Sequence, residues 1–125
     1  MNTVLELYVA TRKRFPELAA RVDQLHVRRW NELAAESTHV WFESLADTIN
    51  ADMKAQVPFQ QHQLLFMTMA DAFERGSKEV KSCIDASFTE NLFWNVPPDK
   101  VEQYWSPLPQ RLRDLYVAFH QRAPV

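Results

Sequence analysis

The chain has 125 residues, of which 46% are hydrophobic and 24% charged, and its formal net charge is −2. This length and composition are typical of one globular domain that buries a core without a metal or a disulfide, and no run of about 18 apolar residues could span a bilayer. The single glycine excludes glycine-rich phosphate loops and nucleotide fingerprints and argues against strand-to-strand turns. We therefore expect an all-α fold, with one domain over residues 1–125.

The first half of the chain predicts helices that begin at recognisable signals. Thr3 and Glu6 have the spacing of a capping box, and the helix that they begin should end near Arg14. The proline two residues further on should open the next helix. Residues 17–56 carry apolar side chains at helical spacing, so they form either two helices broken near Ser37 and Thr38 or one long bent helix. We favour two helices.

The clearest pattern is a helical hairpin between Phe59 and Phe93. A helix that is apolar on nearly all sides follows Pro58, and we place it at the centre of the fold because such a helix is normally surrounded by others. Gly76 should end this helix as a left-handed residue, and Ser77 should cap the next one. The second helix carries an apolar residue at every fourth position: Val80, Ile84, Phe88 and Leu92. It therefore buries one stripe.

The hairpin also carries a family resemblance. The run MADAFERGSKEVKSCIDASFTENLF combines a hydrophobic helix, a Gly-polar turn and a second amphipathic helix. Over about His39 to Phe93 the chain resembles small all-helical bacterial immunity proteins of polymorphic toxin systems, and domains of unknown function found near such toxins. The resemblance implies a cognate toxin as the partner. It brings no catalytic motif, so it implies no residue roles.

The part that follows the hairpin is rich in prolines. The pair Pro97-Pro98 should stop the preceding helix, a short helix should span Asp99 to Tyr104, and Ser106 should cap a last helix. About six helices result. They pack either as an irregular bundle or as stacked antiparallel pairs in the manner of a short α-solenoid.

Two tryptophans in the C-terminal third are candidate interface anchors. Trp94 and Trp105 lie beside turn residues, and Trp and Tyr dominate the residues that carry binding energy at protein interfaces. The alternative is that they form a satellite core with Phe93, Tyr104 and Tyr116 and anchor the last helix.

Charge is distributed unevenly along the chain. Residues 1–30 carry six basic and three acidic side chains, whereas residues 31–102 carry twelve acidic and five basic ones. An acidic surface attracts a cationic partner and raises its association rate. Four acidic residues are therefore predicted to bind the partner: Asp71, Glu74, Asp85 and Glu90. The alternative for each is an ordinary solvated helical face.

No catalytic centre, cofactor or metal site is predicted. Glu36, His39 and Glu43 share one helical face, but a carboxylate di-iron site requires a second Glu-x-x-His pair and further carboxylates. Cys83 lies on the apolar stripe without an adjacent histidine and is a poor nucleophile. Basic residues near the N-terminus could contact phosphates, but the acidic middle of the chain would repel a nucleic acid.

We therefore expect a binding protein without enzymatic activity. Residues 1–15 lack the apolar centre of a signal peptide, and the lone cysteine agrees with a reducing compartment, so we expect the protein in the cytoplasm. The leading hypothesis is an immunity protein that neutralises a cognate toxin by protein–protein contact, with no nucleic-acid or membrane partner. The alternative is a helical adaptor or a secretion chaperone that binds another protein without inhibiting it.

Overall fold

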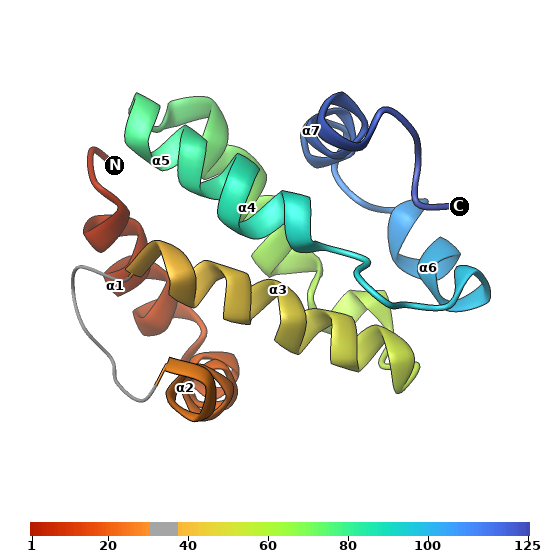
Figure 1. Ribbon diagram of the computed structural model, residues 1–125. Helices are drawn as coiled ribbons and strands as arrows, with labels where there is room; N and C mark the ends of the chain where they lie inside the picture. Colours follow the sequence, from red (N-terminus) through yellow and green to blue (C-terminus); the bar gives the residue numbers. More distant parts are fainter. Residues whose placement is uncertain (31–37) are drawn as a thin grey trace.

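The computed structural model describes residues 1–30 and 38–125, and these residues form seven α-helices and no strand (Figure 1). The helices are α1 (Val4–Arg14), α2 (Pro16–Trp30), α3 (Thr38–Lys54), α4 (Gln63–Arg75), α5 (Lys78–Ser82), α6 (Pro98–Trp105) and α7 (Gln110–His120). Three short segments of other helix types join them: η2 (Phe59–Gln61), η3 (Cys83–Phe88) and η4 (Thr89–Asn91). The prediction of an all-α bundle is confirmed.

Local sequence determines where the first helices begin and end. The hydroxyl oxygen of Thr3 accepts a hydrogen bond from the backbone N–H of Glu6 at 3.1 Å, which caps α1 as predicted. The helix ends at Arg14, and Pro16 opens α2. The described parts of residues 17–56 belong to two helices, α2 and α3. Of the two residues at which the break was predicted, Thr38 is the first residue of α3 and Ser37 lies outside the described residues.

The central helix is α3, which crosses the middle of the molecule in Figure 1 and buries eleven of its residues. The prediction that the helix after Pro58 is central was wrong. That segment forms a single 3₁₀ turn before α4 begins, and two apolar side chains of α4, Leu64 and Met67, are about half exposed. The central position of α3 was not predicted because several of its buried residues, such as Ser44 and Thr48, are polar. A prediction of burial from apolar residues alone does not include them.

The turn between α4 and α5 contains the only glycine of the chain, but for a reason other than the predicted one. Gly76 has an extended conformation, with φ −77° and ψ 163°, so the prediction of a left-handed residue was wrong. A Cβ atom at this position would lie 2.5 Å from the carbonyl oxygen of Ala72 and 2.6 Å from Cγ1 of Val80. Close packing therefore requires the glycine. Ser77 caps α5 as predicted, since its hydroxyl accepts from the N–H of Val80 at 3.3 Å.

The second helix of the hairpin changes type along its length. It begins as α5, widens into a π-helix in η3 and tightens into a 3₁₀ turn in η4. All four stripe residues are buried: Val80, Ile84, Phe88 and Leu92. An α-helix turns by about 100° per residue, so residues four apart drift by about 40° around its axis. A wider helix turns less per residue, and η3 therefore keeps the stripe directed at the core.

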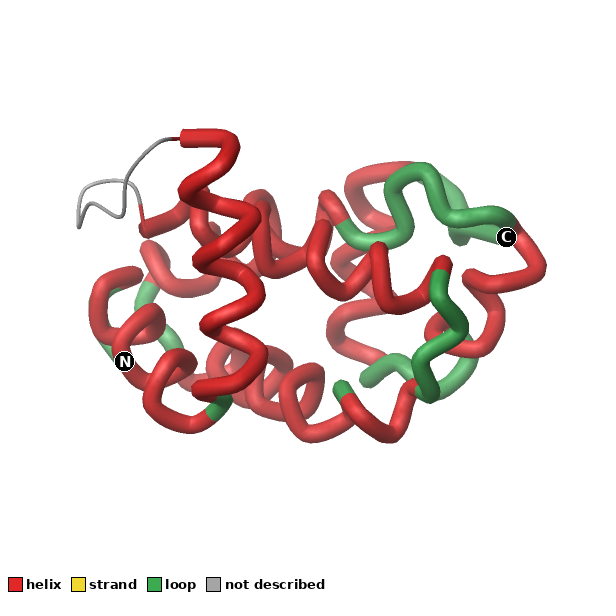
Figure 2. The backbone as a smooth tube through the Cα atoms, turned by 90° about the horizontal axis from the view of Figure 1, so that it is seen from below, coloured by secondary structure: helices red, strands yellow, loops and turns green. Residues whose placement is uncertain are grey.

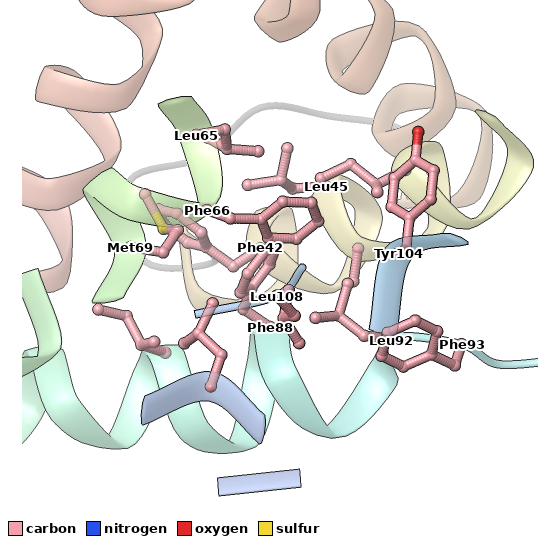
Figure 3. Packing of buried hydrophobic residues seen from close by; sticks show 14 of the residues in the cluster. Phe42, Leu45, Leu65, Phe66, Met69, Phe88, Leu92, Phe93, Tyr104 and Leu108 are labelled. Atoms are coloured by element: carbon pink, nitrogen blue, oxygen red, sulfur yellow. The ribbon is translucent and has the colours of Figure 1, made fainter. Parts of the chain in front are cut away.

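Aromatic rings from several elements fill the core. Phe66 of α4 stacks on Phe59 at a centroid distance of 5.5 Å and meets Phe88 and Tyr104 at 6.2 Å each. Figure 3 shows Phe42 of α3 within the same cluster. These contacts join the hairpin to α3 and α6.

The last two helices lie at the end of the molecule opposite to α1 and α2 (Figure 2). The prediction that Ser106 caps the last helix was wrong, because Ser106 instead ends α6, where its N–H donates to the carbonyl of Glu102 at 3.1 Å. Pro109 occupies the N-cap position of α7. Two prolines in the connection, Pro107 and Pro109, hold the chain out of helical conformation until Gln110.

Candidate functional site

The two candidate tryptophans have different environments. The side chain of Trp94 is 68% exposed, the largest value among the exposed large hydrophobic residues of the described chain. Trp105 is half-buried, and its ring lies 5.7 Å from Phe93 and 5.5 Å from Tyr116. Trp105 therefore belongs to the satellite core, whereas Trp94 faces solvent.

The backbone around Trp94 is held in an unusual conformation. Phe93 and Asn95 on either side of it have φ angles of 69° and 56°, in the left-handed region that non-glycine residues rarely adopt. The buried side chain of Asn50 holds this turn: its Oδ1 accepts from the N–H of Phe93, and its Nδ2 donates to the carbonyl of Asn91, both at 2.8 Å. The indole of Trp94 is thus presented by a fixed turn.

A groove of about 650 Å³ lies beside this turn, between the C-terminal halves of α2 and α3. We call it the Trp94 groove. Its charged lining residues are Arg21, Arg28, Arg29, Asp47 and Lys54, and Trp94 and Asn95 close one side. The described part of the lining thus contains four cations and one carboxylate.

Two of the four cations in the groove are paired inside the protein. Arg29 lies 2.5 Å from Asp47, and Arg21 donates two hydrogen bonds to Asp52, at 2.6 and 3.0 Å. Arg28 donates to the backbone carbonyl of Gln24, at 3.4 Å. Within the described part of the chain, neither Arg28 nor Lys54 has a carboxylate within 4.0 Å. Among the described residues, the groove therefore offers two cations without an acidic partner.

The buried carboxylate of Asp52 supports one wall of the groove. It binds Arg21 of α2 and also lies 2.7 Å from Nε2 of His62 at the start of α4. Burial alone would raise the pKa of Asp52, but the hydrogen bonds from Arg21 and His62 outweigh it and lower the pKa. Asp52 therefore stays ionised and keeps Arg21 in place.

The four predicted acidic residues fall into two kinds of environment. On α4, Asp71 pairs with Arg75 at 3.0 Å and Glu74 pairs with Arg111 of α7. Asp85 and Glu90 are half-buried and have no ion pair within the described residues. Burial raises the pKa of both, and the negative charge of Asp85 adds to the shift at Glu90. Among the described residues, Asp85 and Glu90 thus lack an ion-pair partner, whereas Asp71 and Glu74 each have one.

The remaining reactive side chains form no visible catalytic arrangement. Burial raises the pKa of the Cys83 thiol to about 12, which keeps it protonated and unreactive. His39 is exposed and Glu43 half-buried, while Glu36, the third member of the predicted face, lies outside the described residues. Residues 1–30 and 38–125 contain no group of three or more His, Cys, Asp or Glu side chains that could hold a metal. No described helix is long and apolar enough to cross a membrane.

A second groove of similar volume lies between α1, the start of α3 and η3. Its lining is mostly small or apolar, and its one carboxylate, Glu79, already accepts a hydrogen bond from the N–H of Val4 at 2.7 Å. This groove lacks the exposed aromatic residue and the unpaired cations of the Trp94 groove.

The sequence predicted no role in protein binding for three residues that define the site: Arg28, Lys54 and Asn50. They are separated in sequence from Trp94 by about 40 residues or more, so no local pattern joins them to it. Trp94 was expected to act with the acidic middle of the chain, but the structure places it beside cations. A polar residue inside an apolar helix, as Asn50 is in α3, was the available signal of a buried contact.

Comparison with known proteins identifies a family. Residues 10–122 match the family described as a domain of unknown function (DUF7674). No match was found among curated proteins or among solved structures. Because the family match spans most of its length, the chain belongs to the DUF7674 family.

Proposed function

We propose that the protein is an immunity protein that binds and neutralises a cognate toxin by direct contact, with Trp94 at the centre of the interface. The main observation in support is the turn that presents Trp94. Two left-handed residues, Phe93 and Asn95, are costly to maintain, and the structure maintains them with the buried Asn50 while the indole stays 68% exposed. A rigid, exposed tryptophan is typical of the anchor residues of protein interfaces.

Electrostatics supports the same proposal at a second surface. Asp85 and Glu90 are the predicted acidic residues without an ion pair among the described residues, so they are the ones suited to attract a cationic region of the partner. The internal pairs of Asp71 and Glu74 weaken their part in such attraction. Asp85 in η3 and Glu90 in η4 then attract the partner at long range, and Trp94 supplies binding affinity at contact.

The proposed setting is the bacterial cytoplasm, and the proposed activity is binding without catalysis. The high pKa of Cys83 supports binding over thiol chemistry. The resemblance of residues 39–93 to immunity proteins of polymorphic toxin systems is the reason for choosing a toxin as the partner.

Co-expression with the product of the neighbouring gene tests the proposal. The wild-type protein should protect the host cell from that product, and Trp94→Ala should abolish protection while thermal unfolding stays unchanged. Phe119→Ala is the matched control, because Phe119 is an aromatic residue of α7 that is 55% exposed and lies outside the Trp94 turn. Full protection by Trp94→Ala, or a neighbouring product that is not toxic, would overturn the proposal.

The alternative is an adaptor or secretion chaperone that uses the same surface. The exposed Trp94 turn suits either role, since an anchor residue sets affinity and not the fate of the partner. A partner that binds through Trp94 and keeps its activity in the complex would assign the adaptor role.

A further inference from the structure

We propose that the Trp94 groove receives an acidic, amphipathic peptide segment of the protein partner. Carboxylates of that segment pair with Arg28 and Lys54, and an apolar side chain packs on the indole of Trp94. The inference rests on the proposed function only in taking the partner to be a protein. It assigns a chemistry to the binding site that differs from acidic steering by Asp85 and Glu90.

The charge of the groove selects a negative ligand. The carboxylates of Asp47 and Asp52 already compensate Arg29 and Arg21. In the described lining, the charge that remains is that of Arg28 and Lys54, which come from two different helices. A ligand with carboxylates spaced along a chain can pair with both cations, and charge-assisted hydrogen bonds of this kind are stronger than neutral ones.

A lysine outside the groove lining, Lys100, contacts the backbone of Lys54. The ammonium group of Lys100 donates to the backbone carbonyl of Lys54 at 2.8 Å and so satisfies the C-terminal end of α3. The ammonium group of Lys54 is therefore not needed to cap its own helix. It remains available to a ligand.

The groove also has an apolar part. Leu25 of α2 and Ala51 of α3 line it together with Trp94. An amphipathic segment satisfies both parts, because its acidic residues meet the cations and its apolar residues cover the indole. Asp52, Asp47 and Asn50 already hold Arg21, Arg29 and the Trp94 turn in place, so binding orders few additional side chains.

The same features disfavour a nucleic acid as the ligand. Proteins that bind single strands line a basic channel with several aromatic residues on which bases stack. Among the side chains that the structure describes, the Trp94 groove has one exposed aromatic ring and includes the carboxylate of Asp47 in its lining. A short peptide needs only the two cations and the one indole that the groove supplies.

Fluorescence anisotropy on the full chain tests the inference. The probe is a fluorescein-labelled peptide of alternating Glu and Leu, compared with a peptide in which Gln replaces Glu, one in which Lys replaces Glu, and a single-stranded oligothymidine of equal charge. Only the Glu peptide should bind, and its affinity should fall as ionic strength rises.

Variants locate the binding. Reversal of both cations, Arg28→Glu with Lys54→Glu, should weaken binding of the Glu peptide about tenfold or more, and Trp94→Ala should do the same. The matched control, Lys13→Glu with Lys78→Glu, makes the same change in net charge at exposed positions outside the groove and should leave affinity unchanged. All variants should unfold at the wild-type temperature.

Three results would overturn the inference: equal binding of the Glu and Gln peptides, an equal loss in both double variants, or tighter binding of the oligothymidine. The proposed function fails separately. If Trp94→Ala abolishes protection but no acidic peptide binds, the immunity role stands and this inference falls. If the Glu peptide binds as expected and the neighbouring product is not neutralised, the inference stands and the immunity role falls.

Discussion

The interface between α2 and α3 and the packing of the C-terminal half are built from different chemistry. Four polar side-chain contacts join α2 to α3: Arg21 with Asp52, Asp23 with Trp41, His26 with Ser44, and Arg29 with Asp47. In the C-terminal half, Phe93, Trp105 and Tyr116 contact one another at centroid distances of 5.5 to 5.7 Å. Its ion pairs, Asp71 with Arg75 and Glu74 with Arg111, lie at the surface.

This difference explains how the site is built. Directional polar contacts fix the position of one helix relative to another but add little net stability, since each replaces a contact with water. Aromatic packing supplies stability through buried area and tolerates small shifts. The Trp94 groove lies where the two regions meet, so its cations are held by carboxylates and its indole by a turn that packs on aromatic rings.

The largest loss of stability should come from the aromatic region. Phe66→Ala removes a fully buried ring that contacts Phe59, Phe88 and Tyr104, and should lower the free energy of unfolding by about 3–5 kcal/mol. Chemical denaturation measures it. Phe73→Ala is the control, because Phe73 is only half-buried and should cost less. Equal losses in the two variants would show that aromatic burial does not stabilise this half.

A smaller loss is expected at the polar interface. Asp52→Asn removes the charge that accepts hydrogen bonds from Arg21 and His62, and should cost about 1–3 kcal/mol. Arg21 is half-exposed and regains water, which limits the cost. A double-mutant cycle with Arg21→Gln isolates the contribution of the pair. A coupling energy of zero would mean that this contact does not hold α2 to α3.

The polar interface should also be sensitive to pH. Burial lowers the pKa of His26 below its ordinary value of 6.5, against the attraction of Asp23. The unfolded chain therefore binds more protons than the folded one below about pH 6.5, and stability from His26, complete above that pH, is lost as the pH falls through the lower folded-state pKa. Melting temperatures at pH 7.5 and at lower pH should diverge between wild type and His26→Gln. Parallel curves would exclude His26 as the cause.

The smallest effect is expected for an Asp→Asn substitution in the C-terminal half. Asp71→Asn breaks the pair with Arg75, whose two side chains are 60% and 78% exposed, and should change the free energy of unfolding by no more than about 0.5 kcal/mol. Asp71→Asn and Asp52→Asn thus compare one substitution at two sites under identical conditions. If Asp71→Asn costs as much as Asp52→Asn, the contrast between the two regions is wrong.

Local features of the fold could be predicted, and features that depend on distant contacts could not. The capping of α1 by Thr3 and of α5 by Ser77 follows from a few adjacent residues, and both predictions are confirmed. Gly76 was located correctly at a helix end but explained wrongly, because the crowding comes from Val80 in the next helix. Ser106 was misassigned because the prolines around it, and not the capping residue, determine where α7 starts.

The candidate site was predicted only in part. Trp94 and Trp105 were equivalent in the sequence, since both follow aromatic residues near turns. Their difference arises from the left-handed conformation of Phe93, which turns its own ring inward and Trp94 outward, and from Asn50, which is more than 40 residues away. The cations of the groove come from two helices whose relative placement no local pattern encodes.

The π-helical segment η3 contains one residue more than a regular α-helix would need to align the same buried side chains. The stripe residues Val80, Ile84, Phe88 and Leu92 are spaced by four, four and four, which a regular α-helix cannot keep on one face for long. Deletion of the exposed Ala86 would change the spacing to four, three and four, the pattern that an α-helix does align. Chains of this fold that are one residue shorter at η3 can therefore bury the same four side chains, whereas a one-residue deletion within α3 would rotate half of the central helix out of register with its neighbours.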